Sequence, residues 1–270
     1  MTVPVALTIA GSDSSGGAGI QADLKTFAAL GVYGASVITA LTAQNTQGIA
    51  AIHHVPAHFV TAQIDAVFGD LDVGALKIGM VAHAAVIDAI AAGLSRWTPA
   101  RVVLDPVMVA TSGAHLLESD AIEALRSKLV PRVQLLTPNL PEAAVLLDEP
   151  VAGEETGIVR QGQRLLEFGC AAVLIKGGHM QGPESIDYLV TRQEVMTFTA
   201  PRAATKNTHG TGCSLSSAIV AGLAKGDGME TAVRTAKAYV TAAIAAADRL
   251  NIGRGHGPIH HFHEFERFHF

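Results

Sequence analysis

The sequence predicts a three-layer α/β/α protein with a mostly parallel central sheet and helices on both of its faces. The main observation is that short, continuously apolar segments alternate along the chain with longer segments of helical period. This alternation implies β-α-β crossovers, in which each helix packs on the sheet between two parallel strands. Composition agrees, because 49% of the 270 residues are apolar and only 16% are charged, enough to bury strands on both faces.

The expected strands are apolar throughout rather than alternating, as is typical of strands that are buried on both faces. In chain order they are residues 5–10, 35–41, 75–78, 101–104, 133–136 and 172–175. Helices are expected where apolar residues recur with helical spacing, at 20–30, 58–68, 84–95, 119–129, 142–147 and 159–168. Residues 182–200 interrupt the alternation, and 188–191 and 195–199 are expected to form a hairpin. Two last helices are expected at 213–223 and 229–250.

No internal repeat, low-complexity linker or block of charge marks a domain boundary, so we expect residues 1–270 to form one domain. The 19 basic and 24 acidic residues give a net charge of −5, which argues against a nucleic-acid-binding protein held by phosphate contacts. The high apolar fraction and modest charge also exclude a disordered chain.

Cysteine content and the length of apolar runs bear on location. The only cysteines are Cys170 and Cys213, which are too few for a disulfide framework and suit a reducing cytosol. No apolar run approaches the roughly 18 residues of a membrane span, and the N-terminus lacks the basic region of a signal peptide. We therefore expect a cytoplasmic protein with no membrane or nucleic-acid partner.

Glycine is unusually frequent, at 27 of 270 residues, against an average of about 7%. Many of these glycines follow the expected strands, and so do most of the polar residues of interest. In open α/β sheets, ligands bind beyond the carboxyl ends of the strands. We therefore expect the chemistry in seven loops that meet at this edge, residues 11–19, 44–46, 79–80, 105–108, 137–142, 176–179 and 207–213.

The strongest local signal is the segment Thr208-His-Gly-Thr-Gly-Cys213, which opens a predicted helix. Two glycines and Thr211 at a helix start leave backbone N–H groups free to face an anion, and the helix dipole adds partial positive charge. A transferring phosphoryl group fits such a turn; the alternative is an ordinary glycine-rich loop. Cys213 lies in the first turn, where thiol pKa values are commonly lowered. It is alternatively a small buried apolar residue.

The first loop fits a dinucleotide-binding fingerprint poorly. Read from Gly17 and Gly19, the third glycine position holds Ala22, and no acidic residue follows about 20 positions later. A nicotinamide-dependent dehydrogenase is therefore a weak interpretation. Asp23 is expected in the first turn of the following helix, where its carboxylate either faces the pocket or interacts with the helix dipole.

Three further loops supply charged groups at the same edge. Asp105 follows an apolar strand and should face the crevice. Asn139 and Glu142 have the spacing of a helix capping box, but Glu142 is also suited, with Asp105, to hold Mg²⁺ beside nucleotide phosphates. Lys176 ends another apolar strand and would reach those phosphates as a point charge. Together with the anion-binding turn, these residues predict a phosphoryl-transfer site.

Two features remain open. The tail Gly255-His-Gly-Pro-Ile-His-His-Phe-His263 carries four histidines, but no acidic or cysteine partner stands at ligand spacing, so we favour packed or exposed imidazoles over a metal site. Met80 and Met108 end strands, and either belong to the core or line a flat ring.

Several of these segments resemble the hydroxymethylpyrimidine and phosphomethylpyrimidine kinases of thiamine biosynthesis, in the ribokinase-like superfamily. The matching segments run from about residue 5 to 263. They are AGSDSSGGAGIQADLK (10–25), AQNT (43–46), KIGM (77–80), LDPVM (104–108), TPNLPEA (137–143), KGGH (176–179), KNTHGTGC (206–213) and GPIHHF (257–262).

The resemblance implies a ribokinase-like fold and an ATP- and Mg²⁺-dependent kinase. Such a kinase phosphorylates 4-amino-5-hydroxymethyl-2-methylpyrimidine and then its monophosphate. Gln44 matches the family's pyrimidine-binding glutamine, and an amide with one donor side and one acceptor side suits an aminopyrimidine edge. The other implied pyrimidine-pocket residues are Gly11, Ala18, Asp23, Met80 and Val107. The implied nucleotide residues are Asp105, Asn139, Glu142, Lys176 and Thr208, with Asp105 and Glu142 as metal ligands.

The resemblance also assigns the transfer step. Gly210, Thr211 and Gly212 match the anion hole, with Lys176 beside it. Cys213 stands where the sugar kinases of the superfamily carry an aspartate base, and a thiolate there would deprotonate the hydroxymethyl group. The family further suggests a homodimer. Two other functions stay open: a pyridoxine or pyridoxal kinase of the same branch, and a non-catalytic pyrimidine-binding module.

Overall fold

The structure is a computed structural model that describes residues 2–108 and 119–265. Its strands, in chain order, are β1 (Val5–Asp13), β2 (Tyr33–Asn45), β3 (Gly48–His54), β4 (Val73–Ile78), β5 (Val102–Leu104), β6 (Leu135–Leu136), β7 (Ala172–Ile175), β8 (Glu184–Thr191) and β9 (Val195–Pro201). They form one sheet in the order β3-β2-β1-β4-β5-β6-β7-β8-β9. The strands from β2 to β7 are parallel, whereas β3 at one edge and β8 and β9 at the other are antiparallel.

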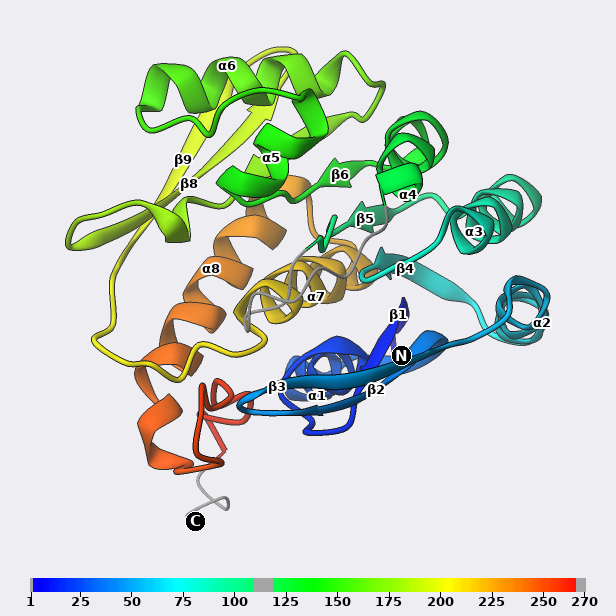
Figure 1. Ribbon diagram of the computed structural model, residues 1–270, viewed down its shortest axis with the longest axis horizontal. Helices are drawn as coiled ribbons and strands as arrows, with labels where there is room; N and C mark the ends of the chain where they lie inside the picture. Colours follow the sequence, from blue (N-terminus) through cyan, green and yellow to red (C-terminus); the bar gives the residue numbers. More distant parts are fainter. Residues whose placement is uncertain (1, 109–118, 266–270) are drawn as a thin grey trace.

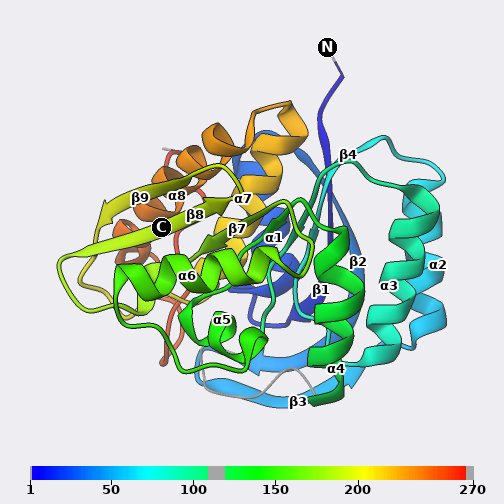
Figure 2. The same ribbon diagram turned by 90° about the horizontal axis from the view of Figure 1, so that it is seen from above.

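Helices cover both faces of this sheet. They are α1 (Gly19–Ala29), α2 (Ala57–Phe68), α3 (Ala84–Trp97), α4 (Ser119–Ala124), α5 (Leu140–Leu147), α6 (Glu155–Leu166), α7 (Thr211–Lys225) and α8 (Met229–Ala245). Figure 1 shows α2, α3 and α4 on one side of the sheet, with α7 and α8 on the other. Figure 2 shows α6 and α8 on opposite sides of β8 and β9. The predicted three-layer architecture is therefore confirmed.

The core lies in two apolar layers, one on each face of the sheet. One layer joins α1, α7 and α8 to the sheet through fully buried residues such as Phe27, Ile219 and Val233. The other joins α2 to α6 to the opposite face, with Ile64 and Ile87 among its buried members. The two layers together make each central strand apolar on both sides, which is the continuous pattern from which those strands were predicted.

The structure departs from the predicted elements in several places. β3 was not predicted, although it contains the short apolar run Ile49–Ile52; it is an edge strand in which no residue is fully buried. β1 continues to Asp13 through a bulge near Gly11, so that Asp13 pairs with Thr42 of β2. The helix predicted at 119–129 consists of α4 followed by a wider π-helical turn, Leu125–Leu129. The last predicted helix ends at Ala245, and a separate short turn, Ala247–Arg249, follows it.

Parallel strands with short loops bring distant segments to one edge of the molecule. The ends of β1, β4, β5 and β7 and the start of α7 lie together there, as expected for the carboxyl edge of such a sheet. Among the described helices, none is both long and apolar enough to cross a membrane.

Candidate active site

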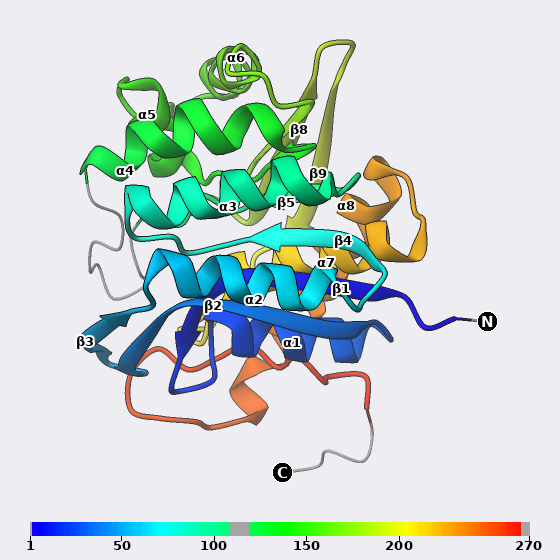
Figure 3. The ribbon, with the colours of Figure 1, turned by 90° about the vertical axis from the view of Figure 1, so that its right-hand side faces the viewer.

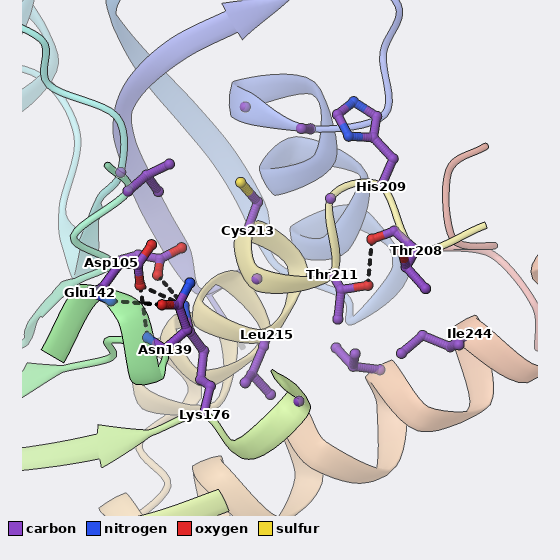
Figure 4. Close-up of a pocket in the computed structure, with 18 of the residues that line it drawn as sticks. Asp105, Asn139, Glu142, Lys176, Thr208, His209, Thr211, Cys213, Leu215 and Ile244 are labelled. Carbon is purple, nitrogen blue, oxygen red and sulfur yellow. Dashed lines mark hydrogen bonds and ion pairs between the residues drawn. The ribbon is translucent and has the colours of Figure 1, made fainter. Parts of the chain in front are cut away.

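A cavity of about 770 Å³ opens at the carboxyl edge of the sheet. It brings together residues that are far apart in the sequence, including Asp105, Glu142, Lys176 and Cys213 (Figure 4). With one exception, every site residue expected from the sequence lines this cavity. The lining residues that were expected are Gly11, Ala18, Gln44, Met80, Asp105, Val107, Asn139, Glu142, Lys176, Thr208, Gly210, Thr211, Gly212 and Cys213. The exception is Asp23.

A lysine between two carboxylates occupies one end of the cavity. Lys176 Nζ lies 2.7 Å from Asp105 Oδ1 and 3.8 Å from Glu142 Oε2. Asp105 is almost fully buried, and it also accepts hydrogen bonds from the hydroxyls of Thr137 and Ser216, each at 3.2 Å. The carboxylate is thus held in place by three side chains from three different elements.

The charged groups in this cluster shift one another's pKa values. Burial disfavours the charged form of Asp105, but Lys176 and then Lys77 outweigh it and hold the pKa of that carboxyl below its usual value. Burial raises the pKa of Glu142 to about 7, with Lys176 opposing and Asp105 adding to the rise. For Lys176 burial favours the neutral amine, yet the two carboxylates raise its pKa above the ordinary lysine value.

The Asn139–Glu142 pair is a capping box. The Asn139 side chain accepts from the Glu142 N–H at 2.8 Å, and Glu142 Oε2 accepts from the Asn139 N–H at 2.7 Å. Both residues nevertheless line the cavity, so the cap and the ligand interpretation are compatible. Two oxygen-donor carboxylates beside one lysine suit Mg²⁺, which prefers hard oxygen ligands. Burial is the main cause of the raised pKa of Glu142, and a divalent cation bound there would favour its ionised form.

The turn before α7 presents free backbone donors to the cavity. Gly210 adopts a left-handed conformation with φ of 82°, and α7 begins at Thr211 without a side-chain cap. The Thr211 hydroxyl and N–H both donate to the Thr208 carbonyl, at 2.7 Å and 3.2 Å. In the described part of the chain, the N–H groups of Gly212 and Cys213 have no acceptor. This is the geometry expected of an anion-binding turn.

Two loops touch backbone to backbone beside this turn. A Cβ on Gly210 would overlap the carbonyl oxygen of Gly17, and a Cβ on Gly17 would overlap the ring of His209. Glycine is therefore required at both positions, because neighbouring atoms occupy the space that a side chain would need. The excess of glycine in the sequence is explained in part by this contact between the first and last ligand-edge loops.

The environment of Cys213 differs from the expectation based on its helix position. Its side chain lies between the acid–lysine cluster and His209 (Figure 4). Burial raises the pKa of this thiol to about 11, although Lys77 lowers it. The expected lowering by the helix start is wrong for the ligand-free site, because loss of water around the sulfur costs more than the helix end supplies.

Asp23 is the one predicted site residue that the cavity does not include. Its helix begins one residue earlier than expected, at Gly19, so Asp23 lies in the second turn and points toward the sheet. There it is fully buried, 2.5 Å from Lys77 Nζ, and accepts from the hydroxyls of Thr8 (2.6 Å) and Ser217 (2.7 Å). The structure thus corrects its expected position: Asp23 is the counter-ion of Lys77, behind the cavity wall.

Lys77 was not singled out in the sequence, although a charged residue within the apolar segment 75–78 was a signal. It is fully buried in β4, and its Nζ also lies 3.3 Å from the Cys213 carbonyl oxygen. Burial favours the neutral amine, but Asp23 raises the pKa of Lys77 above its usual value. A positive charge therefore stands beneath the turn that carries Cys213.

Asp13 organises the first loop and was also missed. Its carboxylate accepts from the N–H groups of Ser15 (2.8 Å), Gly17 (3.1 Å) and Ala18 (2.8 Å). It also lies 2.9 Å from His209 Nε2. Burial opposes ionisation, but the bonds from His209 and Ser15 lower the pKa of Asp13 to about 2. An aspartate followed by serines and glycines was the sequence signal for this carboxylate-centred turn.

His209 and Thr42 lie on either side of the Gln44 amide. An N–H at His209 Nε2 donates a hydrogen bond to the ionised Asp13 carboxylate at 2.9 Å. The same nitrogen lies 3.4 Å from the Gln44 amide nitrogen. The Thr42 hydroxyl lies 3.0 Å from Gln44 Oε1 and 3.0 Å from the Ser12 carbonyl oxygen, and its single hydrogen can serve only one of them. The Gln44 amide lines the cavity between these two groups, where it can present a donor and an acceptor to a ligand.

The histidine-rich tail lies outside the cavity: among the residues described, those at 255–263 contribute nothing to its lining. His260 and His261 are buried, whereas His256 is exposed. Met80 and Met108 both line the cavity, so they are placed where a flat ring would contact them.

The chain is similar to known proteins over nearly its whole length. Residues 13–260 match a family model described as phosphomethylpyrimidine kinase. A Rhizobium meliloti protein named hydroxymethylpyrimidine/phosphomethylpyrimidine kinase is 57% identical over 261 residues, covering 97% of this chain and 98% of that protein. A Geobacter sulfurreducens protein named thiamine biosynthesis bifunctional protein ThiED is 50% identical over 255 residues, covering 94% of this chain and 51% of that protein.

Solved structures share the architecture. A phosphomethylpyrimidine kinase from Clostridium difficile 630 aligns with a TM-score of 0.80 at 43% identity, covering 90% of this chain and 100% of that one. An ADP complex of Bacillus subtilis pyridoxal kinase aligns with a TM-score of 0.89 at 32% identity, covering 96% and 98%. These similarities confirm the ribokinase-like fold expected from the sequence.

Proposed function

Because the chain belongs to the phosphomethylpyrimidine kinase family, we propose that it phosphorylates 4-amino-5-hydroxymethyl-2-methylpyrimidine with ATP and then converts the monophosphate to the diphosphate. The chain is a kinase, and its role lies in thiamine biosynthesis. One observation carries the assignment within the structure. The acid–lysine cluster of Asp105, Glu142 and Lys176 and the free N–H groups of the turn at Gly212 face the same cavity.

The pyrimidine is proposed to bind against Gln44. Its amide would donate an N–H to a ring nitrogen and accept a hydrogen bond from the exocyclic amino group on its oxygen. Met80 and Val107 would form the apolar walls, with Gly11 and Ala18 allowing close approach of the backbone. Asp23 is not part of this proposal, since it is enclosed beneath Lys77, which itself lines the cavity.

The phosphoryl group is proposed to bind between Lys176 and the turn Gly210–Gly212. Lys176 supplies a fixed positive charge, and the turn supplies backbone donors and the positive end of α7. Asp105 and Glu142 would hold Mg²⁺, which neutralises phosphate charge when it is bound. Asn139 would fix Glu142 through the capping box, and Thr208 would line the nucleotide side.

Cys213 is proposed to act on the acceptor in the first transfer only. Its thiol lies beside the turn, in reach of the hydroxymethyl group of a pyrimidine held by Gln44. The thiol is protonated at neutral pH in the ligand-free site, because its pKa is about 11. To act as the base, the thiol must first lose its proton to water; the thiolate then accepts the proton of the hydroxymethyl group while that oxygen attacks the γ-phosphorus of ATP and ADP leaves. The second acceptor is already an anionic phosphate oxygen and requires no base.

Pyridoxal kinase is the second candidate activity, favoured by the structural similarity to pyridoxal kinases at TM-scores of 0.89. Pyridoxal has a hydroxymethyl group on a comparable ring. A steady-state assay of ADP release separates the two: at one ATP concentration, kcat/KM is measured with the hydroxymethylpyrimidine and with pyridoxal. We expect the pyrimidine to be preferred. A preference for pyridoxal refutes the substrate assignment, and pyrimidine binding without ADP release indicates a non-catalytic module.

We further propose that residues 1–270 act as one kinase domain, in the cytoplasm and as a homodimer. The single continuous sheet and the family match over residues 13–260 support the one-domain proposal. The dimer rests on the family resemblance, and the location on the cysteine content. Light scattering of the purified protein tests the dimer directly.

A further inference from the structure

The C-terminal segment returns across the active-site edge after the turn Ala247–Arg249. We call residues 254–263 the C-terminal strap. Figure 3 shows it passing α1 and the ends of β2 and β3. The N–H of Gly255 donates to the Thr46 hydroxyl at 3.1 Å, and the N–H of His256 donates to the Thr46 carbonyl at 2.9 Å. The strap is thus attached to the turn between β2 and β3, two residues after Gln44.

The strap next attaches to the residue before the anion-binding turn. The N–H of His209 donates to the Gly257 carbonyl at 3.1 Å, and the N–H of Ile259 donates to the His209 carbonyl at 3.4 Å. The N–H of Gly257 donates to the Asn207 side chain at 3.0 Å. Both backbone groups of His209 are therefore occupied by the strap.

A histidine attaches the strap to the other end of the turn. His261 is buried, and its Nε2 lies 3.0 Å from the hydroxyl oxygen of Ser214, which is fully buried. The strap is held against α8 at the same point, because Tyr239 donates to the His261 carbonyl at 2.8 Å and the His260 N–H donates to Ala243 at 3.0 Å. His261 and Ser214 therefore form a contact between two rigidly packed segments.

The two attachments enclose the residues that bind the transferring group. His209 precedes Gly210, and Ser214 follows Cys213, so the strap holds the four-residue turn at both of its ends. Elsewhere the turn is supported by Lys77, which contacts the Cys213 carbonyl, and by the close packing of Gly17 against Gly210; the strap adds a contact at each end of a helix start that has no side-chain cap. Gly210 also adopts a left-handed conformation. It must keep this conformation if the N–H groups of Gly212 and Cys213 are to point at the same anion.

We propose that the C-terminal strap positions the anion-binding turn, with His261 as the positioning residue that acts through Ser214. This inference rests on the proposed kinase function, since it assigns the turn its role in phosphoryl transfer. His261 touches neither substrate nor phosphate, so it is a positioning residue rather than a catalytic one. The His261 imidazole thus joins the strap to α7, whereas the backbone groups of His260 and His261 join it to α8.

The state of His261 fits this role. Burial, and then the charges of Lys25, His260 and His263, together lower the pKa of His261 to about 3. The imidazole is therefore neutral at physiological pH. Its Nε2 can either donate a hydrogen bond to the Ser214 hydroxyl oxygen or accept one from that hydroxyl. Glutamine, which has both a donor and an acceptor on its amide, can replace that bond, whereas leucine cannot.

The test compares His261→Leu with two related variants, His261→Gln and Ser214→Ala. We expect His261→Leu to lower kcat at least tenfold, which corresponds to about 1.4 kcal/mol of transition-state stabilisation, with less than a threefold change in the pyrimidine dissociation constant. His261→Gln should recover most of kcat. Ser214→Ala should reproduce the loss, and the double variant should be no worse than either single one, because both remove the same bond.

The matched control is His260→Leu, which removes a neighbouring buried imidazole of the same strap that makes no contact with Ser214. If the strap only stabilises the fold, both leucine variants lower the melting temperature and neither changes kcat. The proposal is overturned if His261→Leu retains kcat within twofold of the parent protein, or if His261→Gln is as impaired as His261→Leu.

A second readout does not depend on the substrate. Cys213 lies inside the enclosed turn, so its alkylation by iodoacetamide in the ligand-free protein reports whether the turn is held. Cys170, which is buried elsewhere, serves as the internal reference. We expect His261→Leu to change the Cys213 rate several-fold, with no change in His260→Leu. If the parent protein proves inactive on the pyrimidine, the proposed function fails, whereas an unchanged alkylation rate in His261→Leu overturns the positioning role.

Discussion

Replacing Lys77 by methionine removes one half of a fully buried ion pair. The ammonium donates to Asp23 Oδ1 at 2.5 Å and to the Cys213 carbonyl at 3.3 Å, and neither charged side chain has measurable exposure. Methionine fills a similar volume without a charge. The Asp23 carboxylate then remains in the core with only the hydroxyls of Thr8 and Ser217 as partners.

The expected cost follows from the burial of both groups. Removing one partner of a buried pair costs about 3–5 kcal/mol, because the other charge stays buried and uncompensated. In domains of about 150–250 residues, each kcal/mol lowers Tm by about 2–4 °C, so Lys77→Met should lower Tm by roughly 6–20 °C. The double variant Asp23→Asn/Lys77→Met should recover most of this loss, since a neutral amide can accept a hydrogen bond from one of the two hydroxyls and donate one to the other.

The assay is urea and thermal unfolding of the parent protein, both single variants and the double variant, without ligand at pH 7. A coupling energy of more than about 2 kcal/mol between the two positions is expected from a direct buried contact. The reasoning is refuted if Lys77→Met costs less than about 1 kcal/mol, or if the losses of the single variants simply add in the double variant. Alkylation of Cys213 should also slow in Lys77→Met, because Lys77 lowers the pKa of that thiol.

Three further predictions concern the reaction. Gly210→Ala should lower kcat by roughly 10²–10³, because a Cβ there overlaps the Gly17 carbonyl and displaces the backbone donors, as a steady-state assay will show. The Mg²⁺ concentration needed for half-maximal rate should rise as pH falls below about 7, because a proton then competes for Glu142, and titrations at several pH values measure this. Cys213→Ala should slow the first phosphoryl transfer far more than the second, as measured in single turnovers with each acceptor.

Each of these has a control and a contrary outcome. Pyrimidine affinity measured without ATP should change little in Gly210→Ala, and a kcat close to the parent value contradicts the anion-binding role of the turn. Glu142→Gln should remove the pH dependence of the Mg²⁺ requirement; if the dependence persists, another group causes it. Equal losses in both transfers for Cys213→Ala leave Cys213 with a positioning role alone.

The location of the site could be predicted because it depends on topology. Asp105 and Lys176 end two apolar strands 71 residues apart, and parallel strands must bring their carboxyl ends to one edge. Their contact at 2.7 Å therefore follows from the order of elements. The capping box at Asn139 and Glu142 could be predicted for a different reason. The two residues are three positions apart at a helix start, and this spacing alone lets each side chain bond the backbone N–H of the other.

Side-chain direction and electrostatics could not be predicted in the same way. Successive side chains along a helix point about 100° apart, and the packing of α1 on the sheet, which turns Asp23 toward Thr8 and Lys77, cannot be read from the local sequence. Lys77 was a charged residue in an apolar run and required a buried partner, but several acidic residues were candidates. The pKa of Cys213 depends on how far water is excluded by segments distant in sequence, which the helix position does not reveal.

The most direct test of the account is the product mass spectrum from the parent protein incubated with ATP, Mg²⁺ and 4-amino-5-hydroxymethyl-2-methylpyrimidine. The account predicts a product with one added phosphoryl group that appears first and is then converted to a product with two. The absence of any phosphorylated pyrimidine, while ATP and the pyrimidine both bind, would contradict it.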